Sequence, residues 1–126
     1  MTRRTITTGS PFERDIGYAR AVVVDSWVFV SGTTGYDYAT MTMPSAVEDQ
    51  CRNAIATIER ALAEAGASLS DVVRVRYILP DPADWPACWP ITRAAFGSAP
   101  PAATMISAAL QNDEMKIEIE ATARLP

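Results

Sequence analysis

Two acidic residues near the C-terminus are the feature of this sequence best suited to chemistry. Glu118 and Glu120 stand two positions apart in an alternating run, so a β-strand would place both carboxylates on one face. Neighbouring carboxylates in a cleft shift each other's pKa, and one of them can then act as a general acid or base. The alternative is the solvated face of an edge strand, which requires no function.

A small-residue segment, Ser31-Gly32-Thr33-Thr34-Gly35, follows an apolar run. Backbone N–H groups in such a segment can bind an anion or a developing oxyanion. The segment lacks the lysine and the spacing of a phosphate-binding loop. A plain turn that ends a strand is the competing interpretation.

Ten of the eleven basic residues are arginines, and arginine can grip a carboxylate or a phosphate through two hydrogen bonds. Any one of them can equally be a surface charge. Tyr18 and Tyr77 can donate a hydrogen bond to a ligand, or can simply pack. The candidate anion anchors are Arg20, Arg74, Arg93 and, most notably because it lies within a predicted strand, Arg76.

The composition of the 126 residues excludes several classes of function. The chain has no histidine, so a Ser-His-Asp triad, a Cys-His pair and a histidine-ligated zinc site are all ruled out. A net charge of -4 argues against a nucleic-acid partner. Cys51 and Cys88 are too few for a disulfide framework and indicate reduced thiols, and the alternative is a single disulfide between them. With no apolar run long enough for a signal peptide or a membrane span, we expect a cytoplasmic protein without a membrane partner.

The first half of the chain predicts three strands and a helix that would position these residues. Strands are expected at Arg3–Thr8, Ala19–Val24 and Trp27–Ser31, with a tight turn at Asp25-Ser26 between the last two. Apolar residues then recur at three- and four-residue spacing, which predicts a helix. Ser45 and Glu48 form a capping-box pattern at its start, and Gly66 suits its end.

The second half predicts a strand, a broken helix and a final pair of strands. Asp71–Leu79 alternates, with Val73, Val75, Tyr77 and Leu79 expected on one face. Asp81 and Pro82 can start a helical segment, but prolines at 86 and 90 predict a turn followed by a short helix, Pro90–Phe96, closed by Gly97. Ala103–Leu110 and Met115–Arg124 are expected to form a hairpin. Of the two cysteines, Cys88 is expected to be more exposed than Cys51, which lies on the apolar stripe of the first helix.

The resulting order, β-β-β-α-β-α-β-β, predicts one α+β domain over residues 1–126. Both helices would cover one face of a single mixed sheet, and the other face would stay bare. A bare apolar sheet face usually finds a partner, so we expect a symmetric homo-oligomer.

Taken together, several stretches resemble the Rid family of reactive intermediate deaminases, also called the YjgF/YER057c/UK114 family. The resemblance spans nearly the whole chain, and its last stretch is the most specific. The stretches are Gly17-Tyr18, Val28-Phe29-Val30-Ser31-Gly32, Gln50, Ala65–Val73, Pro101-Ala102-Ala103-Thr104 and Ile117-Glu118-Ile119-Glu120-Ala121.

The resemblance implies a chorismate-mutase-like α+β fold assembled as a homotrimer, with ligand sites in clefts between subunits. The activity it implies is the hydrolysis of enamines and imines to ketones and ammonia, with no metal or organic cofactor. Ribonuclease activity has been attached to some relatives, and it is the least expected here because the chain is acidic and lacks histidine.

The family's cleft glutamate falls on Glu118, which would hold and polarise the attacking water. The arginine of the deaminases' Pro-Ala-Arg-Ser/Thr motif is Ala103 here, and the thiol two residues later is Met105. Trp89 lies near the place of the cleft asparagine. The expected substrate-binding set is Tyr18, Ser31, Gly32, Arg76, Trp89, Ala103, Thr104 and Met105.

Loss of the arginine removes a bidentate contact to a substrate carboxylate. The sequence therefore predicts a protein that is not a standard 2-imino acid deaminase. One hypothesis is a divergent enzyme whose Glu118 activates water against a less polar enamine or imine. In a variant of this hypothesis, Arg20, Arg76 or Arg93 replaces the missing arginine, and a carboxylate substrate can then bind. The other is a non-catalytic module that binds a small apolar or aromatic metabolite.

Overall fold

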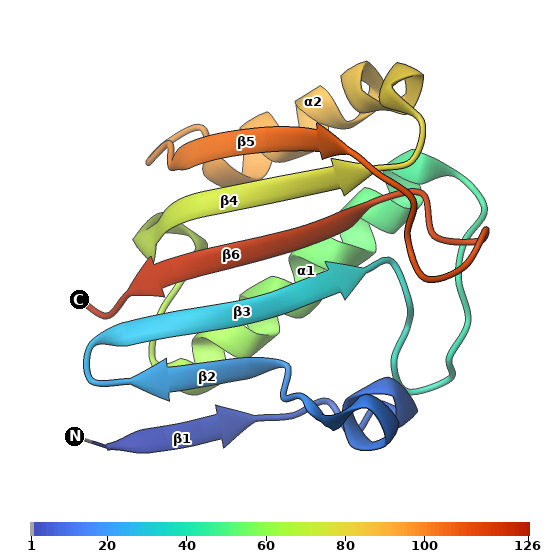
Figure 1. The fold of residues 1–126 in the computed structure, drawn as a ribbon. Helices are drawn as coiled ribbons and strands as arrows, with labels where there is room; N and C mark the ends of the chain where they lie inside the picture. The colour runs from blue at the N-terminus through green and yellow to red at the C-terminus, as the bar shows by residue number, and fades with distance from the viewer. Residues whose placement is uncertain (1) are drawn as a thin grey trace.

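The structure, a computed structural model, describes residues 2–126 as one six-stranded sheet with two helices packed on the same face (Figure 1). The strand order is β1-β2-β3-β6-β4-β5. This confirms the predicted α+β class, the single mixed sheet and the order of elements. The strands and helices are β1 (Arg3–Ile6), β2 (Ala21–Val24), β3 (Trp27–Thr34), α1 (Val47–Ala65), β4 (Val72–Leu79), α2 (Trp85–Phe96), β5 (Ala102–Ser107) and β6 (Glu118–Arg124).

The first three strands form an antiparallel meander. Asp25 takes a positive φ of 53° in the tight turn between β2 and β3, a conformation that aspartate tolerates better than most residues. The prediction that β3 ends at Ser31 is wrong, because the strand continues to Thr34 through a bulge. At this bulge Ser31 and Gly32 together stand opposite Glu120 of β6.

Helix α1 packs its apolar stripe on the middle of the sheet. The stripe includes Cys51, Ile58 and Leu62, all of which are fully buried. Gly66 ends the helix in the left-handed region at φ 88°, as predicted. The predicted capping box is absent, because Ala46 takes the N-cap position and makes no side-chain bond.

A second bulge changes which side chains of β4 face the core. The register shifts between Val72 and Arg74, so Val72 is buried and Val73 is exposed. The predicted inward position of Val73 is therefore wrong, whereas Val75 and Tyr77 lie in the core as expected.

Helix α2 runs without a break from Trp85 to Phe96, so the predicted turn and shorter helix are wrong. Pro86 lies in the first turn, where backbone N–H groups have no partner within the helix. Pro90 then removes only one backbone hydrogen bond, and the packing of α2 offsets that loss. Cys88 is fully buried, contrary to expectation. Asp81 does cap the preceding 3-10 turn, Pro82–Asp84.

The last two strands do not pair with each other. β5 lies at the edge, parallel to β4, whereas β6 lies between β3 and β4 and is antiparallel to both. The predicted hairpin is therefore wrong. The central place of β6 also excludes the interpretation of Glu118 and Glu120 as the face of an edge strand.

The sheet has one covered face and one open face. Ile119, Ala121 and Ala123 of β6 lie buried beneath the helices, whereas Glu118, Glu120 and Thr122 alternate with them on the open side. Large apolar side chains are exposed there as well, and Phe29, in the centre of β3, is 48% exposed. Within residues 2–126, no helix is long and apolar enough to cross a membrane.

Candidate functional site

The carboxylate of Glu118 lies directly against Gly32 in the β3 bulge. A Cβ added to Gly32 would stand 2.6 Å from Glu118 Oε1 and 2.8 Å from its Cδ, which is closer than any side chain could remain. Gly32 is therefore required for close approach rather than for an unusual φ. The bulge and the missing side chain together make the space that Glu118 occupies.

The environment of Glu118 favours its protonated form more than water does. Desolvation by burial raises the pKa of this carboxyl, and the nearby charge of Glu120 raises it further, while Arg20 acts in the opposite direction. A carboxylate with a raised pKa is a stronger base once it is ionised. This combination is typical of a group that exchanges a proton during catalysis.

The two carboxylates of β6 have different surroundings. Arg76 of β4 stands opposite Glu120 in the sheet and forms an ion pair with it, Nη1 to Oε1, at 3.1 Å. Both side chains are partly exposed on the open face. Because Glu120 is held in an ion pair with Arg76, Glu118 is the one of these two carboxylates that is available as a base.

Ser31 ties the bulge to the segment that carries Tyr18. Its hydroxyl donates to the carbonyl of Ala19 at 2.6 Å, and its backbone N–H donates to the carbonyl of Arg20 at 2.9 Å. The Ser31 N–H is therefore not free to bind an anion, as the sequence analysis had considered for this segment. Ser31 supports the site through the backbone, and its oxygen keeps a lone pair for a further donor.

Arg20 lies beneath the site and is fully buried. Its guanidinium donates to Glu13, Tyr18, Gly32 and Thr33, which occupies all three nitrogens. The hypothesis that Arg20 replaces the missing carboxylate anchor is therefore wrong, because it has no N–H left to offer. Arg76 is paired with Glu120, and Arg93 lies exposed in the last turn of α2.

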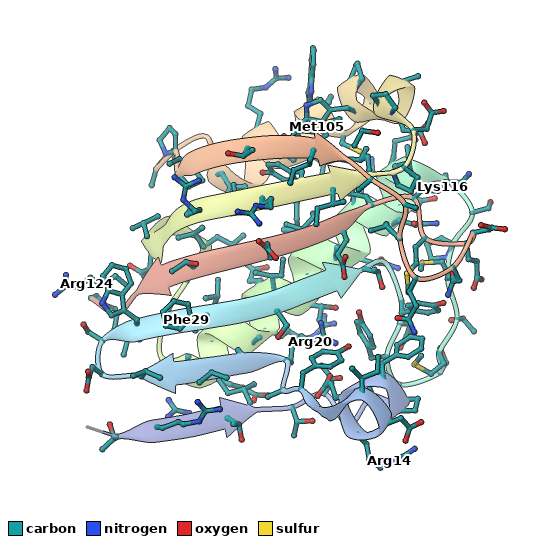
Figure 2. The ribbon with its side chains drawn as sticks, in the orientation of Figure 1. Arg14, Arg20, Phe29, Met105, Lys116 and Arg124 are labelled. Carbon is teal, nitrogen blue, oxygen red and sulfur yellow. The ribbon has the colours of Figure 1, made fainter. Side chains whose placement is uncertain are left out.

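The remaining predicted site residues lie at the other edge of the sheet. β5, which holds Ala103, Thr104 and Met105, is separated from β6 by β4. Met105 packs toward the core beside Tyr77, whereas Thr104 stands opposite Arg76. Trp89 is 51% exposed on α2. Figure 2 shows Met105 and Arg20 well apart, on opposite sides of β4 and β6.

The predicted residues thus form two groups within one protomer. Tyr18, Ser31, Gly32 and Glu118 surround the β3 bulge, and this bulge group is separate from the edge group of Trp89, Ala103 and Met105. A hollow of about 610 Å³ lies between β1, α1 and the loop after β3. Neither Glu118 of the bulge group nor Met105 of the edge group lines this hollow. Across the described part of the chain, no cluster of three His, Cys, Asp or Glu residues is arranged to hold a metal ion.

Glu13 is the residue of this region that the sequence analysis missed. It lies in the single π-turn Glu13–Gly17 and is only 4% exposed, although it carries a charge. Burial by itself raises its pKa, but hydrogen bonds from Thr7 and Thr8 and the charge of Arg20 outweigh that effect and hold the pKa below its usual range. The sequence signal is weak, because Glu13 and Arg20 lie seven positions apart, with neither the three- or four-residue spacing of a helical pair nor the two-residue spacing of a strand face to link them.

Comparison with known proteins agrees with this architecture. The model of the endoribonuclease L-PSP family matches residues 10–125. A 2-iminobutanoate/2-iminopropanoate deaminase of Capra hircus is 30% identical over 98% of this chain and 90% of its own length. A RutC family protein of Pyrococcus abyssi is 32% identical over 84% of each chain.

A solved structure gives the same result. Rv2704 of Mycobacterium tuberculosis, a member of the YjgF/YER057c/UK114 family, is 37% identical, with a TM-score of 0.90 over 98% of this chain and 100% of that one. The fold, the family match and these relatives lead to one conclusion: this chain belongs to the endoribonuclease L-PSP family, which is the Rid or YjgF/YER057c/UK114 family that its sequence resembles.

Proposed function

We propose that this protein is a homotrimer whose composite clefts hydrolyse a small enamine or imine, with Glu118 as the general base. The observation that carries the proposal is the half-buried carboxylate of Glu118, held against Gly32 with a raised pKa on the open face of the sheet. The goat relative named as an iminobutanoate and iminopropanoate deaminase supports the reaction class.

The proposed assembly joins the bulge group of one protomer to the edge group of the next. The open face exposes Trp27 and Phe29, and Ile106 of β5 is 41% exposed, so burying this face against other copies removes apolar surface from water. In a closed symmetric ring, each bulge group would meet a neighbour's β5 edge once. Trp89, Ala103 and the exposed part of the Met105 side chain would then make the second wall of the cleft largely apolar.

In the proposed reaction, an enamine first takes a proton from solvent on its β-carbon and becomes an iminium, whereas an imine becomes one by protonation on nitrogen. Water then donates a hydrogen bond to ionised Glu118 and attacks the carbon of the C=N bond. Glu118 accepts the proton as the new C–O bond forms and the C=N π electrons move to nitrogen. The carbinolamine nitrogen then takes the proton from Glu118, the C–N bond breaks as ammonia leaves, and the hydroxyl proton passes to Glu118 and on to solvent, so the products are a ketone and ammonia. The Tyr18 hydroxyl would donate a hydrogen bond to the substrate.

The expected substrate is neutral or weakly polar. Ala103 offers no guanidinium, Arg20 is fully engaged and Arg76 is paired with Glu120. Charge-assisted hydrogen bonds to a carboxylate contribute about 1.5–3 kcal/mol each, so their absence disfavours a 2-imino acid relative to a neutral analogue.

The proposal is tested by supplying freshly generated 2-aminoacrylate and neutral enamines and following ammonia and ketone. We expect the wild type to hydrolyse a neutral enamine faster than it hydrolyses 2-aminoacrylate. In Glu118→Gln, the rate of hydrolysis should fall by about 10²–10⁴-fold. Glu120→Gln, which changes the neighbouring carboxylate in the same way, is the matched control and should keep most of the activity. Thermal stabilisation by these compounds without turnover would contradict catalysis and favour the non-catalytic binding module.

A further inference from the structure

A fully buried arginine beneath the bulge is the feature that the proposed reaction leaves unexplained. Arg20 has no exposed surface, and each of its five N–H groups has a partner. Nε and Nη2 donate to Glu13 Oε2 at 3.3 and 3.2 Å. A buried charge with a complete set of partners is costly to assemble and is rarely kept for surface properties alone.

Glu13 is held as firmly as the arginine that it neutralises. Its Oε1 accepts from the Thr7 hydroxyl at 2.6 Å and from the Thr8 backbone N–H at 3.2 Å. The Thr8 hydroxyl donates to Oε2. The ion pair is therefore anchored to the segment that follows β1, so Arg20 cannot swing away without breaking these contacts.

The other guanidinium contacts reach the bulge group. Nη1 donates to the Gly32 carbonyl at 2.9 Å and to the Thr33 hydroxyl at 3.1 Å, on either side of the backbone that makes room for Glu118. The Thr33 hydroxyl in turn donates to the Ser31 carbonyl at 2.8 Å. One rigid side chain thus fixes the two bulge residues, Ser31 and Gly32, and Thr33, which follows them.

The fifth contact fixes the direction of the Tyr18 hydroxyl. Nη2 donates to the Tyr18 oxygen at 3.3 Å, and the guanidinium carbon lies 5.4 Å from the centre of the same ring. Because this oxygen already accepts a hydrogen bond, its own proton is left to point elsewhere. The same guanidinium carbon lies 4.7 Å from the centre of the Tyr38 ring.

We propose that Arg20, locked to Glu13, is a positioning residue that holds the backbone of Ser31–Thr33 in place for Glu118 and orients the Tyr18 proton toward the substrate. This inference rests on the proposed function, because it assigns Arg20 a role at the same site. It acts through Gly32 and Tyr18 and does not touch the substrate. A lysine cannot replace it, because three donors on one nitrogen cannot reach Glu13, Gly32 and Tyr18 together.

The electrostatic effect of Arg20 accompanies its geometric effect. The groups whose charges act on Glu118 are Glu120 of the same strand, which raises its pKa, and Arg20, which lowers it. Arg76, on the adjacent strand, is paired with Glu120. The charge of Arg20 and its hydrogen bond also oppose the increase in the pKa of Tyr18 that burial causes. Removing the charge should therefore raise both pKa values.

The test separates the charge of Arg20 from its shape. The double variant Glu13→Gln/Arg20→Gln removes both charges, so that neither charge is left buried without a partner. Arg20→Lys keeps the positive charge but loses the planar guanidinium with its five N–H donors. Arg52→Gln, at an exposed arginine of α1, is the matched control. Folding is verified by the thermal transition, and carbon-13 NMR follows the Glu118 carboxyl and the Tyr18 ring carbon that bears oxygen.

We expect the Glu118 pKa to rise in the double variant and to stay near the wild-type value in Arg20→Lys. The carbon-13 signal of the Tyr18 ring carbon that bears oxygen should shift from its wild-type position in both variants. In the control, Arg52→Gln, this signal should stay at the wild-type position. Hydrolysis of the neutral enamine should fall about a hundredfold in both, mainly in kcat, because the catalytic groups are misplaced rather than absent.

If folded Arg20→Lys gives the wild-type Tyr18 signal and wild-type kcat, the positioning role is overturned. The same holds if the Glu118 pKa in the folded double variant equals that of the wild type. The NMR measurements need no turnover, so they decide the role of Arg20 even if the wild type hydrolyses none of the compounds, an outcome that would overturn only the proposed reaction. Should the double variant not fold, Arg20→Lys decides by its Tyr18 signal.

Discussion

The Glu118 carboxylate occupies the space that a side chain at Gly32 would fill, with the nearest approach of an added Cβ at 2.6 Å. This contact links a bulge in β3 to the first residue of β6, strands that are distant in sequence but adjacent in the sheet. A single missing methyl group therefore sets where the proposed base can lie.

The first prediction concerns Gly32→Ala. The new methyl group should displace Glu118, which is flexible at its end, so the protein should fold normally while hydrolysis falls about a hundredfold. Steady-state kinetics and a thermal transition measure the two effects. In the Gly32→Ala/Glu118→Gln double variant the losses should not add, because both changes act on one group. Full activity in Gly32→Ala would show that the position of Glu118 is irrelevant.

The second prediction concerns pH. Glu118 must be ionised to accept a proton, so kcat/KM should fall as pH drops through its raised pKa. Because the charge of Glu120 contributes to that increase, Glu120→Gln should lower the pKa and move the acid limb to lower pH. A pH–rate profile of both proteins measures the shift. An acid limb that moves upward, or does not move, is the contrary result.

The third prediction concerns the open face. Phe29→Asp places a charge in the centre of the proposed contact between copies and should weaken assembly by about 2 kcal/mol or more. Light scattering should then show a shift from the assembly toward the 13.6 kDa monomer. Ala63→Asp, at an exposed position of α1, is the control and should leave the mass unchanged. Equal masses for all three proteins would argue against the open face as the interface.

The fourth prediction concerns the missing anchor. Ala103→Arg should restore a bidentate contact to a carboxylate and improve kcat/KM for a 2-imino acid relative to a neutral enamine, by about tenfold or more. Ala63→Arg places the same charge at an exposed position of α1, away from the open face, and should leave this ratio unchanged. If the two variants behave alike, position 103 does not line the cleft.

Much of the fold follows from local patterns, and the exceptions have definite physical causes. The alternation of β6 and the apolar stripe of α1 are regular, so their buried faces were predictable. The bulges at Ser31–Gly32 and Val72–Arg74 were not, because one extra residue reverses the alternation without any marker in composition. The central place of β6 depends on pairing with β3 and β4, which local sequence does not encode.

The site divides in the same way. Glu118, Gly32, Ser31 and Tyr18 were predicted from the sequence as site residues, and the structure brings them together around one bulge. The lock of Glu13 on Arg20 was missed, because its partners come from the segment after β1, a π-turn and the bulge of β3. Arg20 was one of several candidate anchors for a ligand, whereas its burial and its hydrogen bonds show that it binds other residues of the protein.

The central claim is that Glu118 acts in a cleft shared by two copies of the chain, and a subunit-mixing experiment tests it most directly. Glu118→Gln removes the proposed base from the bulge group. Ala103→Glu places a negative charge in the edge group, across the proposed cleft from Glu118, so each variant alone should be inactive. In oligomers formed from an equal mixture, about one quarter of the clefts should combine an intact bulge group with an intact edge group, and activity should return to about that fraction of wild type. A mixture as inactive as its two components would contradict the shared cleft.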